Sequence, residues 1–282
     1  MKFQGKAYSL LPIINELGQL PGLDLQDLTL FFILILIASL RVGAFLIAAP
    51  FFGTRMVPLQ IRIIFSFCLG FWILDVATFP DRTVLMSAKL IPIIFQEIII
   101  GISAGLVLTI AFASVGLAGE KIAATSGLAF ASQVDPNGGG QSPVISSFLT
   151  LFMIVIFFAI NGHLVVFAII YESFDMIPIG KFEDYSRLPT IGLTAAELML
   201  KTSALLMLPI VSILFLVNVS IGFITKSAPQ LNLFSFGFPM TILGAFFILY
   251  FSVDALAFGF QDLARASLEL VSNLLLGEAN GG

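Results

Sequence analysis

Few residues in this chain of 282 have the chemistry of a catalyst or a metal ligand. Cys68 is the only cysteine and His163 the only histidine, so the chain forms no disulfide, Cys/His zinc site or Cys–His catalytic pair of its own. Glu97 lies in a long apolar stretch, where a carboxylate can carry protons as in transporters. A charge at a helix end or at an interface is the other interpretation, because no paired base stands out. The sequence therefore predicts no catalytic residue, no cofactor and no metal site.

A glycine-rich loop, GLAFASQVDPNGGGQSPV, occupies residues 127–144 between two apolar stretches. It is not a phosphate-binding loop, because the preceding strand, the Gly-Lys-Ser/Thr signature and the helix start are missing. The Asp-Pro-Asn-Gly sequence at 135–138 favours a turn, and the adjacent glycines add backbone freedom that an ordinary turn does not require. Bulky apolar side chains project from a segment otherwise made of small residues: Leu128, Phe130 and Val134. The pattern predicts a loop that moves or fits tightly; the alternative is a solvent loop after a packed helix.

Two further patterns indicate contacts between helices. Gly101 and Gly105 flank Ala104 in small-xxx-small spacing, which lets helix backbones approach closely within the protein or against a partner. The stretch KSAPQLNLFSFGFPM at 226–240 combines a turn-restraining proline with the amides of Gln230 and Asn232 at a junction of two apolar stretches. We interpret this junction as an interface, with structural capping of a hairpin as the alternative.

The elements that position these residues belong to a membrane protein. Hydrophobic residues make up 59% of the chain and charged residues 11%, and the mean hydropathy is +1.07. Because only helices and closed barrels satisfy their backbone polar groups in lipid, the long apolar stretches predict an all-α fold. The net charge of −4 and the absence of a basic run argue against nucleic acid as a partner.

About six long apolar helical segments are expected. The pair Asn161-Gly162 favours a turn and splits one of them into two helices too short to cross a bilayer, unless that segment is a single kinked helix. The six stretches lie at about 28–52, 61–79, 90–118, 144–174, 202–224 and 235–260.

Six charged residues lie inside these stretches or at their edges. Each is costly in lipid unless it faces protein or water, so we expect other protein chains around them. They are Arg41, Arg62, Glu97, Glu120, Lys121 and Asp254.

Five stretches that follow one another along nearly the whole chain share a pattern with a known family. They are RVGAFLIAAPFFGTRMVP (41–58), QEIIIGISAGL (96–106), GEKIAATSGLAFASQVDP (119–136), NGHL (161–164) and APQLNLFSFGFP (228–239). Together they resemble the flagellar biosynthetic protein R (FliR) family, which is related to the T subunit of virulence type III secretion.

The resemblance implies a non-catalytic subunit of the flagellar export gate, assembled with P and Q subunits into a helical pore for unfolded flagellar proteins. The B and A export proteins and membrane lipid are the further partners it implies. Such complexes are located at the bacterial inner membrane, within the flagellar basal body. Most of the assembled complex lies above the plane of the membrane. The domains expected are an extension (1–27), a P-like helical part (28–180), a connection (181–192), a Q-like helical pair (193–265) and a tail (266–282).

In similar proteins the loop matching 127–144 enters the pore as a plug that helps to keep it closed. The residues assigned to the plug are Leu128, Phe130, Gln133, Val134, Asp135, Pro136, Gly138, Gly139 and Gly140. Those assigned to assembly are Gly101, Ala104, Gly105, Pro229, Gln230, Leu231 and Asn232. A secondary transporter that uses Glu97 and the break at Asn161-Gly162 is the alternative function.

Overall fold

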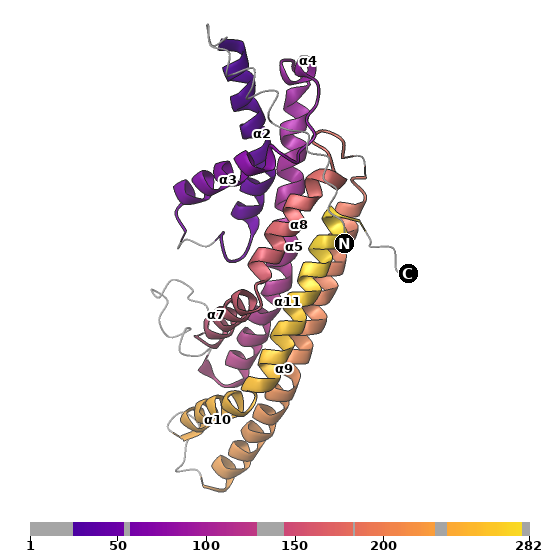
Figure 1. Ribbon diagram of the computed structural model, residues 1–282. Helices are drawn as coiled ribbons and strands as arrows, with labels where there is room; N and C mark the ends of the chain where they lie inside the picture. The colour runs from indigo at the N-terminus through magenta and orange to yellow at the C-terminus, as the bar shows by residue number, and fades with distance from the viewer. Residues whose placement is uncertain (1–24, 54–56, 129–143, 183, 229–235, 278–282) are drawn as a thin grey trace, which may run out of the picture. The chain divides into compact units, whose positions relative to one another are not determined.

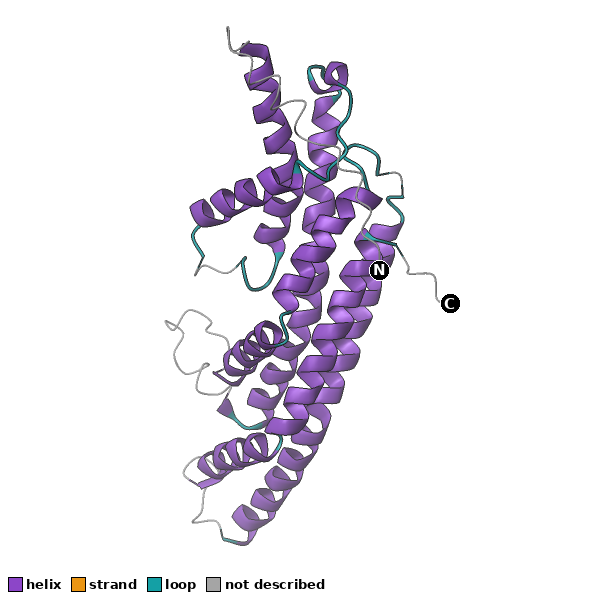
Figure 2. Cartoon of the chain, in the orientation of Figure 1, coloured by secondary structure: helices purple, strands orange, loops and turns teal. Residues whose placement is uncertain are grey.

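The computed structural model describes residues 25–53, 57–128, 144–182, 184–228 and 236–277. Within these ranges the chain is helical and contains no strand (Figure 2), which confirms the all-α prediction. The helices, labelled in Figure 1, are α2 (Leu25–Ala48), α3 (Leu59–Ile73), α4 (Arg82–Leu85), α5 (Leu90–Thr125), α7 (Val144–Ala159), α8 (Gly162–Met176), α9 (Arg187–Ser227), α10 (Phe238–Phe251) and α11 (Val253–Leu275).

Several of these helices are long and apolar enough to cross a membrane. By length and composition α2, α5 and α9 each qualify, and the number rises from three to five if the bent pairs α7/α8 and α10/α11 each count as one span. Helix α5 has 36 residues. At the usual rise it is therefore about 54 Å long, whereas a hydrocarbon core is about 30 Å thick. Helices α5 and α9 therefore extend beyond what spanning alone requires.

The predicted break at Asn161-Gly162 is confirmed. Helix α7 ends at Ala159, α8 begins at Gly162, and the two are bent by 65°. Asn161 has a φ of 58°, the left-handed conformation that asparagine tolerates better than most residues. The two helices have 16 and 15 residues, so each is too short to cross a bilayer alone.

A second break, which the sequence did not predict, lies between α10 and α11. These helices are bent by 64° around Ser252, where neither glycine nor proline is present.

Helix boundaries also differ from the predicted segments at two places. Helix α9 begins at Arg187, inside the stretch predicted as a connection. Pro189 does not prevent this start, because the N–H groups of a first turn have no acceptor within the helix. Helix α11 continues to Leu275, since Val271 and Leu274 are buried.

The described chain divides into two compact units, each of which combines segments from both sides of the 178–192 stretch. The first unit contains residues up to Leu106, Phe167–Pro189 and the residues from Val271 onward. In it α3 packs closely on α2: a Cβ at Gly70 would lie 2.9 Å from the Cβ of Ser39. A cluster of contacting aromatic rings also packs in this unit; they belong to Phe45, Phe52, Phe65 and Phe167.

The second unit contains Val107–Val166 and Thr190–Leu270. Helix α7 lies against α5, where the Ser146 hydroxyl donates a 3.0 Å hydrogen bond to the carbonyl of Gly116. A Cβ at Gly119 would lie 2.5 Å from the Cα of Ser146, so the two backbones approach closely. Phe152 of α7 meets Phe260 of α11 edge to face, with ring centroids 5.6 Å apart.

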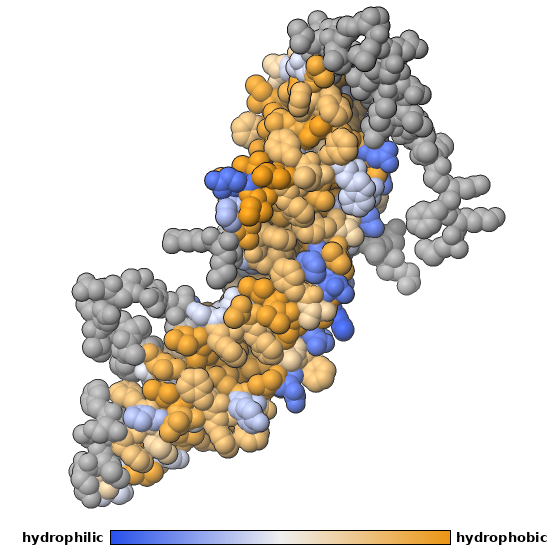
Figure 3. All heavy atoms as spheres, turned by 60° about the vertical axis from the view of Figure 1, so that its left-hand side comes forward, coloured by the Kyte–Doolittle hydropathy of each residue, from blue (hydrophilic) through white to orange (hydrophobic). Residues whose placement is uncertain are grey.

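Much of the surface is apolar. The face drawn in Figure 3 is mostly hydrophobic, with hydrophilic residues in the minority. Large exposed hydrophobic side chains are numerous on α3, α9 and α10, for example Trp72, Phe223 and Tyr250. A soluble monomer rarely exposes apolar surface on this scale, so these helices are suited to surroundings of lipid or other protein chains.

Candidate functional site

The predicted plug loop can be approached from its two ends. Leu128 is the one assigned plug residue that the structure describes, and it is half-buried, three residues after the end of α5. The other assigned plug residues lie outside the described residues: Phe130, Gln133, Val134, Asp135, Pro136, Gly138, Gly139 and Gly140. Helix α5 precedes the loop and α7 follows it, and these helices are in contact at Gly119 and Ser146. The loop therefore begins and ends on one packed pair of helices.

The last carbonyl groups of α5, from Ile122 to Thr125, all have hydrogen-bond donors. The last carbonyl groups of a helix have no partner within it and must find one elsewhere. The Ile122 carbonyl accepts the Ser126 N–H at 3.0 Å, and the Ala124 carbonyl accepts the Gly127 N–H at 3.3 Å. Between them, the Ala123 carbonyl accepts the Ser126 hydroxyl at 2.9 Å. The final turn is thus closed by its own residues.

The next two carbonyl groups are bonded by side chains from distant helices. The Asn218 amide on α9 donates to the Thr125 carbonyl at 3.0 Å. On α10, the Thr241 hydroxyl lies 3.0 Å from the carbonyl oxygen of Ser126 and 3.0 Å from that of Phe238, so its single hydrogen faces two acceptors. Side chains of α9 and α10 therefore bond to the residues just before the 127–144 loop.

Gly127 completes this contact. Its φ of 82° lies in the left-handed region, where glycine ends a helix without the cost that a side chain would bring. A Cβ at this position would also lie 2.7 Å from the Cδ1 atom of Phe238, so the ring occupies the space that a side chain would need. Both the backbone conformation and the packing require glycine here.

The sequence did not single out Asn218 or Thr241. It placed the polar chemistry of this junction at Pro229, Gln230, Leu231 and Asn232, all of which lie outside the described residues. A signal was present: Asn218 is the one amide in the apolar stretch 202–224, and Thr241 follows Pro239 in the first turn of α10.

The small residues of α5 pack inside the first unit. Gly101, Ala104 and Gly105 are all buried. A Cβ at Gly105 would lie 2.6 Å from the Cβ of Ala48, and a Cβ at Gly101 would collide with the carbonyl oxygen of Arg41. The small residues therefore let α2 pack directly on α5, which is the close packing that their spacing predicts. Their assignment to contacts with partner subunits stays a prediction.

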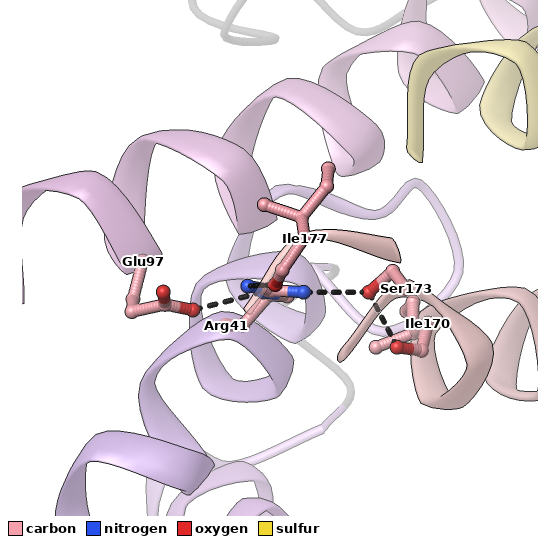
Figure 4. Close-up of polar contacts among 5 residues, drawn as sticks. All are labelled: Arg41, Glu97, Ile170, Ser173 and Ile177. Carbon is pink, nitrogen blue, oxygen red and sulfur yellow. Dashed lines mark hydrogen bonds and ion pairs between the residues drawn. The ribbon is translucent and has the colours of Figure 1, made fainter. Parts of the chain in front are cut away.

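Glu97 has a base partner that the sequence did not identify. Figure 4 shows the Arg41 guanidinium between three segments. Its Nε donates to Glu97 Oε2 at 2.9 Å, its Nη1 to the Ser173 hydroxyl at 2.8 Å, and its Nη2 to the Ile177 carbonyl at 3.0 Å. Both charged side chains are buried, and the guanidinium carbon lies 4.0 Å from the centre of the Phe174 ring.

This pairing corrects one expectation. Arg41 and Glu97 are surrounded by their own chain and not by other chains, because each neutralises the other inside the first unit. The transporter interpretation loses the unpaired carboxylate on which it depended. The expectation stays open for Glu120, Lys121 and Asp254, which are exposed in this chain. Arg62 is half-buried and donates from Nη2 to the Val57 carbonyl at 2.8 Å.

The described residues offer no other constellation for chemistry. No group of three His, Cys, Asp or Glu side chains is close enough to hold a metal ion within the part of the chain that the structure describes. Cys68 is exposed on α3, and the His163 ring stacks on Phe158 with centroids 4.6 Å apart.

Comparison with known proteins gives one consistent family. Residues 32–267 match the family model described as bacterial export proteins, family 1. The flagellar biosynthetic protein FliR of Escherichia coli (strain K12) is 32% identical over 204 residues, covering 72% of this chain and 77% of that protein. Its counterpart in Aquifex aeolicus (strain VF5) is 28% identical over 239 residues, covering 83% and 92% respectively. The Bacillus subtilis (strain 168) counterpart is 28% identical over 243 residues, covering 85% and 93%.

Proposed function

Because this chain belongs to the FliR family of bacterial export proteins, we propose that it is a non-catalytic subunit of the flagellar type III protein-export gate. It is a membrane component of a flagellar export apparatus. In this proposal the chain assembles with P and Q subunits into a pore for unfolded flagellar proteins. The complex contacts the B and A export proteins. The complex lies in the inner membrane, within the basal body.

Within this gate the 127–144 loop acts as a plug. A pore wide enough for an unfolded chain leaks ions unless apolar or bulky groups fill it, and apolar constrictions can close a pore by excluding water. The observation that supports this role is the base of the loop: α5 and α7 are packed through Gly119 and Ser146. Such a base holds both ends of an inserted segment without depending on the segment itself.

The exposed apolar helices support a role in a larger assembly. Helix α9 exposes Leu200, Phe215 and Phe223 together with the charged Glu197 and Lys201. Charges on an otherwise apolar helix are costly against lipid and can be matched by polar groups of another protein. Contacts with P and Q subunits would cover this helix.

Deletion of residues 129–140 tests the plug. The deletion leaves Gly119, Ser146 and the helices around them unchanged, so the complex should still assemble. Ion conductance, measured in cells that make intact and deleted complexes at equal abundance, should rise in the deletion. Equal conductance from assembled complexes would refute the plug and leave the loop as a connection.

A further inference from the structure

We propose that Asn218 and Thr241 are positioning residues that fix the carboxyl end of α5 and so hold the base of the 127–144 loop in the closed gate. The proposal rests on the plug function of that loop. It concerns only described residues: the last turn of α5, Gly127, and the facing parts of α9 and α10.

The first argument is the origin of the hydrogen bonds. Asn218 is 93 residues from Thr125 in sequence, and Thr241 is 115 residues from Ser126. A helix end in contact with water needs no such donors, because water satisfies its carbonyl groups. Ser126 is fully buried and Thr241 is 3% exposed, whereas Thr125 and Asn218 are half-buried. The Ser126 carbonyl therefore requires the protein donor that α10 provides, and α9 provides a second donor to the neighbouring Thr125 carbonyl.

The second argument is the direction in which the chain leaves α5. Gly127 adopts the left-handed conformation, and the Phe238 ring lies against its Cα. Three contacts from the α9–α10 pair, made by Asn218, Phe238 and Thr241, thus converge on three consecutive residues, 125–127. A displacement of α10 away from α9 would break at least one of them. The position of the loop base therefore depends on how these two helices are paired.

The third argument is that the bonds of Asn218 and Thr241 differ from the common hydroxyl bonds within a single helix. The Thr225 hydroxyl on α9 bonds only to carbonyl groups of its own helix, Ile221 at 3.0 Å and Gly222 at 3.1 Å. Such a bond is local and can be lost without changing any contact between helices. Asn218 and Thr241, in contrast, each join two helices.

The test uses the complete export complex with Asn218→Leu and Thr241→Val, singly and together. Thr225→Val is the matched control, because it removes the same hydroxyl from the same helix pair without removing a contact to α5. Thr241→Ser keeps the donor and should restore wild-type behaviour, which separates the hydrogen bond from the shape of the side chain. Two quantities are measured in complexes of confirmed assembly: amide hydrogen exchange of residues 122–128 and ion conductance across the membrane.

We expect exchange to be about fivefold faster in each single variant, the factor for one lost net hydrogen bond, and faster still in the double variant. Conductance should rise above wild type in the double variant and stay unchanged in the Thr225→Val control. Wild-type exchange in an assembled double variant would overturn the proposal. Faster exchange with wild-type conductance would also overturn it, provided that the 129–140 deletion does leak.

The deletion separates this inference from the function on which it rests. If the deletion leaks and the double variant does not, the plug stands and the positioning role is wrong. If the deletion does not leak, the plug is wrong, and exchange at residues 122–128 alone then decides whether Asn218 and Thr241 fix the end of α5.

Discussion

The Nε atom of Arg41 on α2 donates a 2.9 Å hydrogen bond to the Oε2 atom of Glu97 on α5, and both side chains are buried. Removing two charges from water is costly, and the cost is repaid only when the pair is close and its remaining donors and acceptors are bonded. Ser173 and the Ile177 carbonyl bind the other guanidinium nitrogens, whereas the buried Oε1 atom of Glu97 has no hydrogen-bond partner among the described residues. The pair thus joins α2 and α5 to the end of α8 and the residue that follows it.

Replacing one member of the pair should therefore destabilise the chain more than replacing both members. We expect Arg41→Met to destabilise the chain by about 3–5 kcal/mol, because Glu97 is left charged or forced to protonate in a buried place. The double variant Arg41→Met/Glu97→Leu should recover much of that loss. Cellular abundance and the melting temperature of the purified complex measure both. The exposed pair Asp184–Arg187 is the control, and Arg187→Met, which removes only the cation of that pair, should change both quantities much less than Arg41→Met. A double variant no better than the single would contradict the argument.

The close approach of α2 and α5 gives the next prediction. A Cβ at Gly105 would lie 2.6 Å from the Ala48 Cβ and 3.0 Å from backbone atoms of Ala48 and Ala49. Gly105→Ala should therefore destabilise the protein by roughly 1–3 kcal/mol, since one helix must shift. Gly192 on α9 has no atom within 4 Å of such a Cβ, so Gly192→Ala should be neutral or slightly stabilising. Melting temperatures of the two complexes decide: equal values would mean that α2 and α5 can separate freely.

Assembly provides a prediction at the level of the whole chain. Expressed alone, the protein should aggregate or be degraded, because α3, α9 and α10 expose many large apolar side chains. Co-expression with P-like and Q-like partners should rescue it. Protease resistance and the mass of the particle in mild detergent are the measurements. A stable, protease-resistant monomer without partners would count against the proposed function.

The sequence was most informative where the cause is local. The break at Asn161-Gly162 was predicted because turn-forming residues act on their own backbone, and Asn161 does adopt the left-handed conformation. The bend at Ser252 was missed because Phe251, Ser252 and Val253 give no turn signal. The 64° bend between α10 and α11 therefore has no local signal in the sequence.

Long-range pairings explain the rest of what was missed. Arg41 and Glu97 are 56 residues apart, so each looked like an isolated charge until the fold brought α2 onto α5. Asn218 and Thr241 have their acceptors 93 and 115 residues away, and nothing in their neighbouring residues indicates those acceptors. The small residues Gly101 and Gly105 did predict close packing, because spacing along one helix face is itself a local property.

The amides predicted at the α9–α10 junction can be tested without a structure of that segment. Helix α9 ends at Ser227 and α10 begins at Phe238, so Gln230 and Asn232 lie in the connection between them. Replacing both with Leu should weaken assembly or export, because a buried partner group left unpaired costs about 1–3 kcal/mol. The substitution Glu278→Gln serves as a control in the tail. Normal assembly and export of the double-Leu protein would mean that the two amides are not needed and that this segment is a turn that tolerates substitution.

Phe130 provides the sharpest test of how the plug would work. Of the bulky residues assigned to the loop it is the only aromatic one, so it carries the largest apolar surface that could exclude water from a closed pore. Phe130→Ala removes that ring and keeps the glycines, the Asp-Pro turn and the base at Gly127. Ion conductance should therefore rise, but less than in the 129–140 deletion, while assembly is unchanged.

Phe148→Ala is the matched control for Phe130→Ala. It removes an equal ring from α7, four residues after that helix begins, where the side chain is exposed. Conductance of this control should equal that of wild type at equal abundance. If Phe130→Ala and Phe148→Ala give the same conductance while the deletion leaks, the loop closes the pore by its bulk and backbone and not by an aromatic seal.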